Sequence, residues 1–269
     1  MKLDSAFLLA SLVAYAIAAP SRAIGTDSTT ISIRSAPNLP EHRVRQWWEY
    51  KGEDVTTQSA ASSILQAIDN LNEVTKYQQE RGFQIESTDE EGTVENGIED
   101  NEPCQPLTMI FARGTNEAGN MGKVIGKPLA ASLRTQTGNK VIVQGVNYDA
   151  SFEGNLLLGL NGGPIMAKLL KQSLAQCPDS KVVLVGYSQG AMVTHAGALL
   201  SEHGVSAIAA FGGPGRFVPF VNVSADKVKK YCLPGDPVCL NGFDLDAHSE
   251  YGVFANDAAQ FLIQASGAQ

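Results

Sequence analysis

The stretch 181–200 constrains the fold most, because it predicts a buried strand, a tight turn and a helix in immediate succession. The strand reads Lys-Val-Val-Leu-Val at 181–185, and such an apolar run is typical of a strand covered on both faces. The turn reads Gly-Tyr-Ser-Gln-Gly at 186–190. Side chains flanking the central residue of so tight a turn would clash, and glycine avoids this. The hydroxyl of Ser188 is therefore expected to stand above the end of the strand, close to the first N–H groups of the helix.

The chain from residue 103 onward alternates predicted strands with predicted helices. Strands are expected at 107–112, 140–146, 181–185, 205–211 and 228–232. Helices are expected at 124–133, 165–175, 191–200 and 250–264. This alternation favours the α/β class, with a mainly parallel five-stranded sheet and helices on both of its faces.

Residues 20–102 differ in composition from the rest. The segment 21–100 contains 15 acidic and 7 basic residues, which accounts for the whole net charge of −8. Its most acidic part, 86–102, has few apolar residues and predicts a flexible linker. One helix is predicted near 59–78 from apolar residues that recur on one face: Ile64, Ile68, Leu71 and Val74. We expect a leader or pro-segment at 20–102, largely disordered apart from this helix, and a folded domain at 103–269.

Two roles are open for this leader. It can be a removable or disordered segment with no further function. Alternatively, its helix covers an apolar surface of the domain until the segment is cut away.

The N-terminal residues 1–19 are predicted to be a signal peptide. A positive start at Lys2 precedes an apolar run that ends in small residues suited to cleavage. The run is shorter than the roughly 20 apolar residues of a membrane helix, so stable membrane insertion is not expected. The protein is therefore expected to be secreted to the extracellular space. Its net charge of −8 argues against a nucleic-acid partner.

The chain has four cysteines, and an even number in an exported protein suggests two disulfides. The four cysteines are Cys104, Cys177, Cys232 and Cys239, and they can pair in three ways. No Cys-x-x-Cys pair is present and only four histidines occur, so no metal site is expected.

A serine nucleophile needs a general base, and four histidines compete for that role. His42 lies in the leader. His195 lies two turns beyond Ser188 on the following helix, roughly 10 Å away at a rise of about 1.5 Å per residue. His203 lies near the end of that helix, where a positive charge suits the helix dipole. His248 alone follows a strand-end acid, in the order serine, acid, histidine of α/β hydrolases, and is the predicted base.

The acid that orients this base is predicted to be Asp236. It follows the last strand within Cys-Leu-Pro-Gly-Asp-Pro-Val-Cys at 232–239, where a disulfide would hold the carboxylate still. Asp244 and Asp246 are rivals. Asp246 is only two residues from His248, which makes it difficult for its carboxylate to reach the far side of the ring.

The tetrahedral oxyanion of acyl transfer needs donors as well. One is expected to be the N–H of Gln189, directly after the nucleophile. The other is expected from the loop after the first strand, where Gly114 allows close approach and Thr115 offers both an N–H and a hydroxyl. An ordinary turn residue is the alternative for Thr115.

Four motifs together resemble those of the fungal cutinases and their relatives, the acetylxylan esterases. In chain order they are Ala-Arg-Gly-Thr at 112–115, Gly-Tyr-Ser-Gln-Gly at 186–190, the segment 232–239 quoted above and His-Ser-Glu-Tyr-Gly at 248–252. The resemblance extends over about 104–265. It implies an α/β-hydrolase domain that hydrolyses esters without a metal or organic cofactor.

The resemblance also implies roles for individual residues. Ser188, Asp236 and His248 would form the catalytic triad and carry an acyl-enzyme on Ser188. Thr115 and Gln189 would form the oxyanion hole. The disulfides implied are Cys104–Cys177 and Cys232–Cys239.

The loop at 240–247 leaves the substrate open. In cutinases this loop contacts the acyl chain through apolar side chains, but here Phe243 and Leu245 alternate with Asp244 and Asp246. The first interpretation is a monomeric cutinase-type esterase that hydrolyses cutin or other aliphatic esters, with a plant-surface polyester or acylated polymer as partner. The alternative is an acetylxylan esterase or another short-acyl polysaccharide esterase. A third, of another class, is a non-catalytic secreted binding or effector protein on a hydrolase scaffold.

The tripeptide Asn-Val-Ser at 222–224 is an acceptor sequence for N-glycosylation in an exported protein. Such tripeptides also occur by chance. Asn222 is therefore a candidate site of glycosylation.

Overall fold

The structure is a computed structural model that describes residues 57–80 and 93–268. The predicted signal peptide at 1–19, His42 and the leader segments 20–56 and 81–92 lie outside the described residues. Within the two described ranges, no helix is long and apolar enough to cross a membrane.

One parallel sheet forms the centre of the described domain. Its strands are β1 (Leu107–Ala112), β2 (Val141–Gly145), β3 (Lys181–Tyr187), β4 (Val205–Phe211) and β5 (Val228–Tyr231). Their order across the sheet is β2-β1-β3-β4-β5, and each neighbouring pair is parallel. The predicted α/β class is thereby confirmed. Because parallel strands end at one edge, the loops after β1, β3, β4 and β5 meet there.

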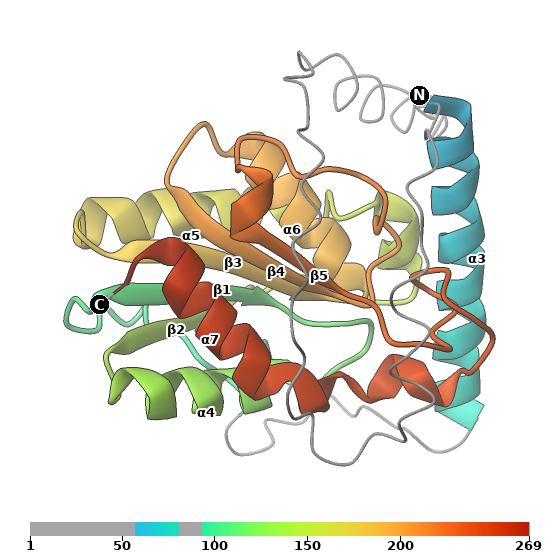
Figure 1. Cartoon of the computed structure of the whole chain (residues 1–269), viewed down its shortest axis with the longest axis horizontal. Coiled ribbons are helices and arrows are strands. Elements are labelled where there is room, and N and C mark those ends of the chain that lie inside the picture. The colour runs from blue at the N-terminus through green and yellow to red at the C-terminus, as the bar shows by residue number, and fades with distance from the viewer. Residues whose placement is uncertain (1–56, 81–92, 269) are drawn as a thin grey trace.

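Helices cover both faces of the sheet (Figure 1). α4 (Gly126–Thr137) and α7 (Ala255–Ser266) lie on one face, and α5 (Gly163–Gln176) and α6 (Gln189–Leu200) on the other. Alternate side chains of a strand point to opposite faces. In β1, Met109 and Phe111 join the core under α4 and α7, whereas Ile110 and Ala112 join the core under α5 and α6. This explains why the strands are apolar throughout.

Two helix boundaries differ by four or more residues from the sequence-based expectation. α4 continues to Thr137, where Gly138 adopts the left-handed conformation (φ 63°) and its N–H bonds back to the carbonyl of Arg134. α7 begins at Ala255 rather than at 250, because two 3₁₀ turns, η4 (Asp246–Ser249) and η5 (Tyr251–Phe254), precede it.

Residues 93–102 pack on the domain, although the sequence predicts a flexible linker up to 102. Ile98 is buried, and its N–H donates to Gln144 Oε1 at 3.0 Å. Glu95 forms a two-point ion pair with Arg134 of α4, at 2.7 and 2.8 Å. Residues 93–102 are therefore packed against the domain and do not form a flexible linker. These backbone and ion-pair contacts hold the segment in place, and they cannot be predicted from its acidic composition.

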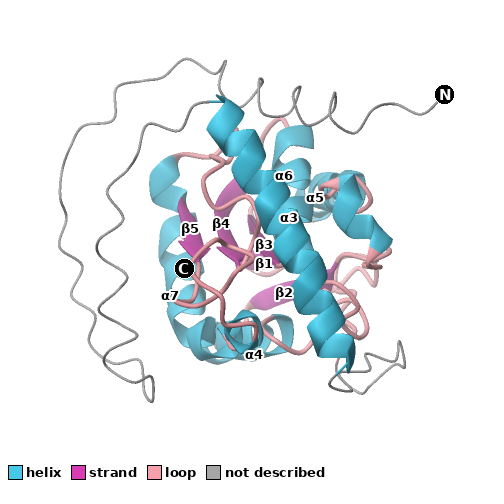
Figure 2. Ribbon diagram, turned by 90° about the vertical axis from the view of Figure 1, so that its right-hand side faces the viewer, coloured by secondary structure: helices cyan, strands magenta, loops and turns pink. Residues whose placement is uncertain are grey.

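The helix predicted near 59–78 is α3 (Thr57–Glu80). It runs across the carboxyl edge of the sheet, on the side where the strand-end loops meet (Figures 1 and 2). Its buried apolar side chains are Ala67, Ile68, Leu71 and Val74. Leu71 and Val74 share a small core with Met192 of α6 and Val238 of the loop after β5.

Two disulfides tie loops to the sheet. Cys104 pairs with Cys177, which joins the segment before β1 to the end of α5. Cys232 pairs with Cys239 and closes the short loop after β5. These are the pairs that the resemblance implies.

Candidate active site

Ser188 occupies a strained turn between β3 and α6. Its φ of 56° and ψ of −120° lie outside the regions that residues with a side chain favour. A Cβ on Gly186 would lie 2.1 Å from the carbonyl oxygen of Gly190, and one on Gly190 would lie 2.0 Å from that of Ala112. Both glycines are therefore needed for the turn to close, as the motif suggests.

Three side chains from separate segments form one hydrogen-bonded chain at the carboxyl edge of the sheet. Ser188 Oγ lies 2.9 Å from His248 Nε2, and His248 Nδ1 lies 2.9 Å from Asp236 Oδ2. Ser188 and His248 are each 2% exposed and Asp236 is 0% exposed. A proton held on Nδ1 by the carboxylate leaves Nε2 to accept the hydrogen of the serine hydroxyl. The arrangement can therefore activate Ser188 as a nucleophile.

Asp236 is held through both of its carboxylate oxygens. Val238 N–H donates to Oδ1 at 2.8 Å, and the Tyr251 hydroxyl donates to Oδ2 at 2.5 Å. The 232–239 disulfide closes the loop around it. His248 Nδ1 thus meets Asp236 rather than either of the two rival aspartates of the following loop.

Two tyrosines that sequence reasoning did not assign a role support this chain. Besides bonding to Asp236, Tyr251 accepts a hydrogen bond from Leu233 N–H at 3.1 Å. The hydroxyl of Tyr187 donates to the carbonyl oxygen of His248 at 2.6 Å, and the two rings lie 5.2 Å apart. Burial raises the pKa of both tyrosines well above the usual value, so both remain donors. Tyr251 lies within the fourth family motif, but nothing in its local sequence indicates the Asp236 contact.

The side chains of the two residues expected to form the oxyanion hole both donate hydrogen bonds to a third residue, Asn155. Thr115 Oγ1 donates to Asn155 Oδ1 at 2.9 Å, and Gln189 Nε2 donates to the same oxygen at 2.8 Å. Asn155 lies in the 3₁₀ turn η2 (Glu153–Leu157) and is fully buried. A single asparagine in an irregular loop carries no sequence signal for this role, so it escaped the sequence analysis.

The remaining described histidines lie elsewhere. The His195 ring stacks on Phe220, with centroids 3.7 Å apart. Burial, reinforced by the neighbouring charge of Lys230, lowers the pKa of His195 well below the usual value. His203 is exposed beyond the C-terminal end of α6. His248 is therefore the histidine that the fold brings to Ser188.

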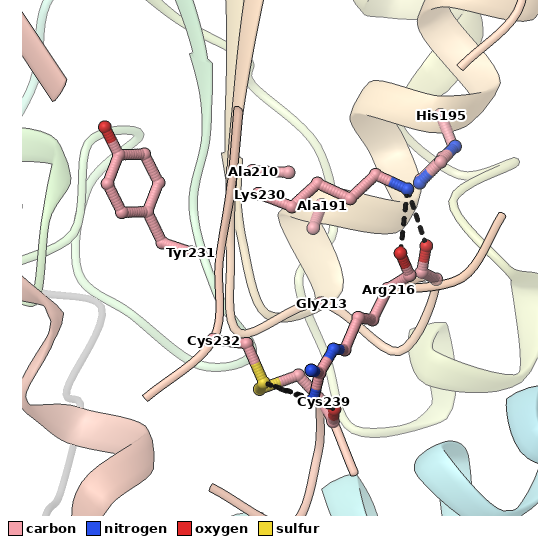
Figure 3. A pocket seen from close by; sticks show the side chains of 10 residues that line it. Ala191, His195, Ala210, Gly213, Arg216, Lys230, Tyr231, Cys232 and Cys239 are labelled. Carbon is pink, nitrogen blue, oxygen red and sulfur yellow. Dashed lines mark hydrogen bonds between the residues drawn. A yellow bond between two sulfur atoms is a disulfide. The ribbon is translucent and has the colours of Figure 1, made fainter. Parts of the chain in front are cut away.

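A small cavity beside the Cys232–Cys239 disulfide has a basic lining (Figure 3). Lys230 Nζ donates to the carbonyl oxygens of Gly215 at 3.2 Å and Arg216 at 3.0 Å, and burial lowers the pKa of Lys230 to about 8. The Arg216 guanidinium donates to the carbonyl oxygen of Cys239 at 3.3 Å. These bonds join the loop after β4 to the loop that contains Asp236. Across the described residues, no group of three or more His, Cys, Asp or Glu side chains could hold a metal ion.

Comparison with known proteins identifies the family. The Cutinase family model matches residues 103–266. The chain is 50% identical over 173 residues to Cutinase 4 of Emericella nidulans, covering 64% of this chain and 77% of the relative. It is 39% identical over 171 residues to a cutinase of Botryotinia fuckeliana, covering 61% and 85%.

Solved structures agree. A Trichoderma reesei cutinase in complex with a phosphonate inhibitor superimposes with a TM-score of 0.59 at 33% identity, covering 76% of this chain and 91% of that one. An acetylxylan esterase superimposes with a TM-score of 0.52, covering 61% and 100%, but at 22% identity this likeness concerns the fold alone. Because the family model spans more than half of the sequence, the chain belongs to the cutinase family and is a carboxylic ester hydrolase.

Proposed function

We propose that Ser188 is the nucleophile of this ester hydrolase, with His248 as general base and Asp236 as the acid that orients it. One observation carries the proposal: a buried hydrogen-bonded chain runs from Ser188 Oγ through the His248 ring to Asp236 Oδ2, with both distances at 2.9 Å. A serine, a histidine and an aspartate in this geometry activate a serine hydroxyl that is otherwise a weak nucleophile.

In the proposed reaction, Ser188 Oγ attacks the carbonyl carbon of the ester while its proton passes to His248 Nε2. The tetrahedral intermediate collapses, the bond to the alcohol oxygen breaks, and the alcohol leaves with the proton from Nε2. Water then attacks the acyl-enzyme and gives a proton to Nε2. Oγ recovers that proton as the carboxylic acid is released. Asp236 stays ionised and stabilises the imidazolium in both halves.

The oxyanion of both intermediates is proposed to be stabilised by the N–H groups of Thr115 and Gln189. Thr115 follows β1 and Gln189 follows the nucleophile, so both lie at the carboxyl edge of the sheet. Their side chains are held by Asn155, which limits the movement of the two segments. Fixed donors of this kind stabilise developing charge without reorganisation.

Cutin or another aliphatic polyester is the proposed substrate. Beside α3, the loop before His248 and the turn η2 expose large apolar side chains: Phe243 is 97% exposed, Leu156 63% and Leu157 50%. Exposed apolar groups that gather near a site favour an apolar polymer over a polysaccharide. The names of the cutinase relatives point the same way. Asp244 and Asp246 interrupt the first loop, and the sequence Asp-Pro-Val-Cys-Leu-Asn-Gly at 236–242 resembles the acetylxylan esterases, so acetylated xylan is the alternative substrate.

Rates on p-nitrophenyl esters of increasing acyl length test this substrate. Higher kcat/KM on butyrate and longer esters than on acetate supports an aliphatic substrate, together with release of fatty acids from cutin. Activity confined to acetyl esters would instead support the polysaccharide alternative. A fluorophosphonate that reacts stoichiometrically with Ser188 in the folded protein tests the chemistry. No labelling, together with unchanged activity in Ser188→Ala, would reject Ser188 and assign the activity to another residue. Only the absence of any ester hydrolysis would support the non-catalytic scaffold.

We also propose that α3 belongs to a leader that covers this site. Asn70 Nδ2 donates to the carbonyl oxygen of Pro237 at 2.7 Å, directly beside Asp236. Leu71 packs on Met192 and Val238, near the start of α6 and in the Asp236 loop. Asn155 Nδ2 donates to Asn72 Oδ1 at 3.4 Å. α3 thus contacts α6, which follows Ser188, the loop that contains Asp236, and the turn η2 that contains Asn155.

This cover is expected to slow access to Ser188 until α3 is displaced or removed. Leu71→Asp in the full chain places a charge in the α3 contact, which should weaken docking by enough to raise fluorophosphonate labelling about tenfold or more. Glu73→Lys changes an exposed position of the same helix and is the matched control. Equal labelling rates in all three proteins, with folding intact, would reject the covering role.

Secretion and a monomeric state complete the proposal. The predicted signal peptide and the two disulfides support export to an oxidising compartment. Asn222 is exposed, as a glycosylation site requires. Recovery of the protein from culture medium tests secretion, and N-terminal sequencing locates any leader cleavage. The mass of the denatured chain tests glycosylation of Asn222, and the mass of the native protein tests the monomeric state.

A further inference from the structure

One buried carboxylate lies outside the proposed triad. Glu117 is 8% exposed and belongs to the loop after β1 that also contains Thr115. Its Oε2 accepts from Gly114 N–H at 2.8 Å, while Oε1 accepts from Lys123 N–H at 2.8 Å and from Val124 N–H at 2.9 Å. Both oxygens are engaged, and they join two stretches of backbone that are otherwise separate turns.

The surrounding backbone leaves room for this carboxylate and little else. A Cβ on Gly122, whose φ is +62°, would lie 2.3 Å from Glu117 Oε2. A Cβ on Gly114 would lie 2.7 Å from the Tyr187 ring, whose hydroxyl donates to the carbonyl oxygen of His248. The Glu117 loop is thus packed directly on Tyr187, the residue that precedes Ser188. Small shifts of this loop would therefore displace residues of the candidate site.

Charged and titratable neighbours surround Glu117 on several sides. Arg113 Nε donates to the carbonyl oxygen of Glu117 at 2.8 Å, and its guanidinium carbon lies 5.2 Å from the Tyr148 ring centroid. Burial raises the pKa of Glu117, whereas the three N–H donors and the Arg113 charge act in the opposite direction. The carboxylate contributes to the raised pKa of Tyr187 and of Tyr148.

We propose that Glu117 is a positioning residue for the oxyanion hole. By accepting from Gly114 N–H, it fixes the peptide between Arg113 and Gly114. This peptide immediately precedes the one that carries the Thr115 N–H, the proposed oxyanion donor. Gly114 has no side chain with which to anchor itself, so the carboxylate supplies the anchor. This inference rests on the proposed function, because it assumes that Thr115 faces the developing oxyanion.

A positioning role differs measurably from a purely structural one. Oxyanion donors act at about 2.7–3.1 Å from a charge that exists only in the transition state. A misplaced donor therefore lowers kcat and has little effect on substrate binding. Loss of a merely structural contact lowers stability and the fraction of active molecules, but each active molecule turns over at the usual rate.

The experiment compares the full chain with Glu117→Gln, Glu117→Asp and the control Glu202→Gln, an exposed glutamate on the loop before β4. An amide can accept only through its oxygen, and aspartate is too short to reach both stretches. Fluorophosphonate titration gives the number of active sites in each protein. kcat per titrated site and KM are then measured on soluble p-nitrophenyl butyrate, and thermal unfolding is recorded.

We expect kcat per titrated site to fall about 10- to 100-fold in Glu117→Gln, with KM within about threefold and Glu202→Gln unchanged. If Glu117→Gln does not fold, Glu117→Asp is judged by the same criterion. A kcat per titrated site within twofold of the original protein overturns the proposal, whatever happens to stability, and so does failure of both variants to give any titratable enzyme. If neither the unaltered protein nor its Leu71→Asp variant, in which α3 docking is weakened, can be titrated at Ser188, the proposed function fails instead, so the two failures are distinct.

Discussion

The Tyr251 hydroxyl donates a 2.5 Å hydrogen bond to Asp236 Oδ2, the same oxygen that meets His248 Nδ1. Tyr251 follows His248 by only three residues, in a separate 3₁₀ turn, so one short segment supplies both partners of this oxygen. The tyrosine thereby fixes the position of the carboxylate against the imidazole. Asp236 Oδ1 is satisfied independently by Val238 N–H, so the carboxylate has little freedom to rotate.

Removing this hydroxyl should weaken catalysis without abolishing it. In Tyr251→Phe we expect kcat to fall about tenfold, because a buried hydrogen bond worth about 1–2 kcal/mol no longer holds Asp236. The control is Tyr231→Phe, which removes a 2.7 Å bond to Asp257. That variant should lose stability and keep its kcat. Similar kcat losses in both variants would show that the Asp236 contact has no special role.

The three aspartates between β5 and His248 should differ sharply in their contribution to activity. Asp236→Asn should lower kcat by about 10⁴, because the amide no longer stabilises the imidazolium. Asp244→Asn and Asp246→Asn should stay within about threefold of the original kcat. The measurement is kcat on p-nitrophenyl butyrate per titrated Ser188. A larger loss in either of the last two variants would reassign the acid.

The two disulfides should separate stability from activity. Replacing Cys104 and Cys177 by serine opens a loop with a sequence separation of 73, which should cost about 4–5 kcal/mol of unfolding free energy with little change in kcat at 25 °C. Replacing Cys232 and Cys239 opens a separation of 7 and should cost only about 2–3 kcal/mol. The second change should nevertheless reduce kcat more, because this loop holds Asp236. Urea unfolding and kcat measurements on both double variants test whether the variant that loses more stability loses less activity.

His195 should make stability fall on acidification. Its pKa in the folded protein is well below the usual value, so it stays neutral where the unfolded chain binds a proton. Stability is therefore fully present above about pH 6.5 and is lost as pH falls below it, by up to about 1.4 kcal/mol per pH unit. Urea unfolding of His195→Gln between pH 7.5 and 4.5 should show a shallower loss than the original protein. His203→Gln, an exposed control, should keep the original slope.

Features that depend on neighbours in the chain were accessible from the sequence. The strands appear as apolar runs because both faces of the sheet are covered, as the alternation within β1 shows. Gly186 and Gly190 signal the nucleophile turn because backbone carbonyls occupy the space that a Cβ would take. His248 and Asp236 could be ranked above their rivals because Asp236 directly follows a predicted strand and His248 follows it in the chain order of α/β-hydrolase triads.

Features that depend on distant contacts were not accessible. Asn155 meets Thr115 and Gln189 across sequence separations of 40 and 34 residues. The 93–102 segment has the composition of a linker, yet Ile98 and Glu95 find partners on β2 and α4. The sequence predicts that the last helix begins at Glu250, but two 3₁₀ turns precede α7 and place His248 and Tyr251 against Asp236.

The fold class and the nucleophile role expected of Ser188 follow from the amino-acid sequence alone, because apolar periodicity and a glycine-framed turn are local and sterically demanding. Three features follow from tertiary contacts alone: Tyr251 meets Asp236, Glu117 joins two backbone turns, and α3 crosses the carboxyl edge of the sheet. Each of these depends on buried polar or apolar groups from separate segments meeting at hydrogen-bond or packing distance. That meeting is a property of the packed domain as a whole, because burial forces each polar group to find a partner wherever the fold provides one.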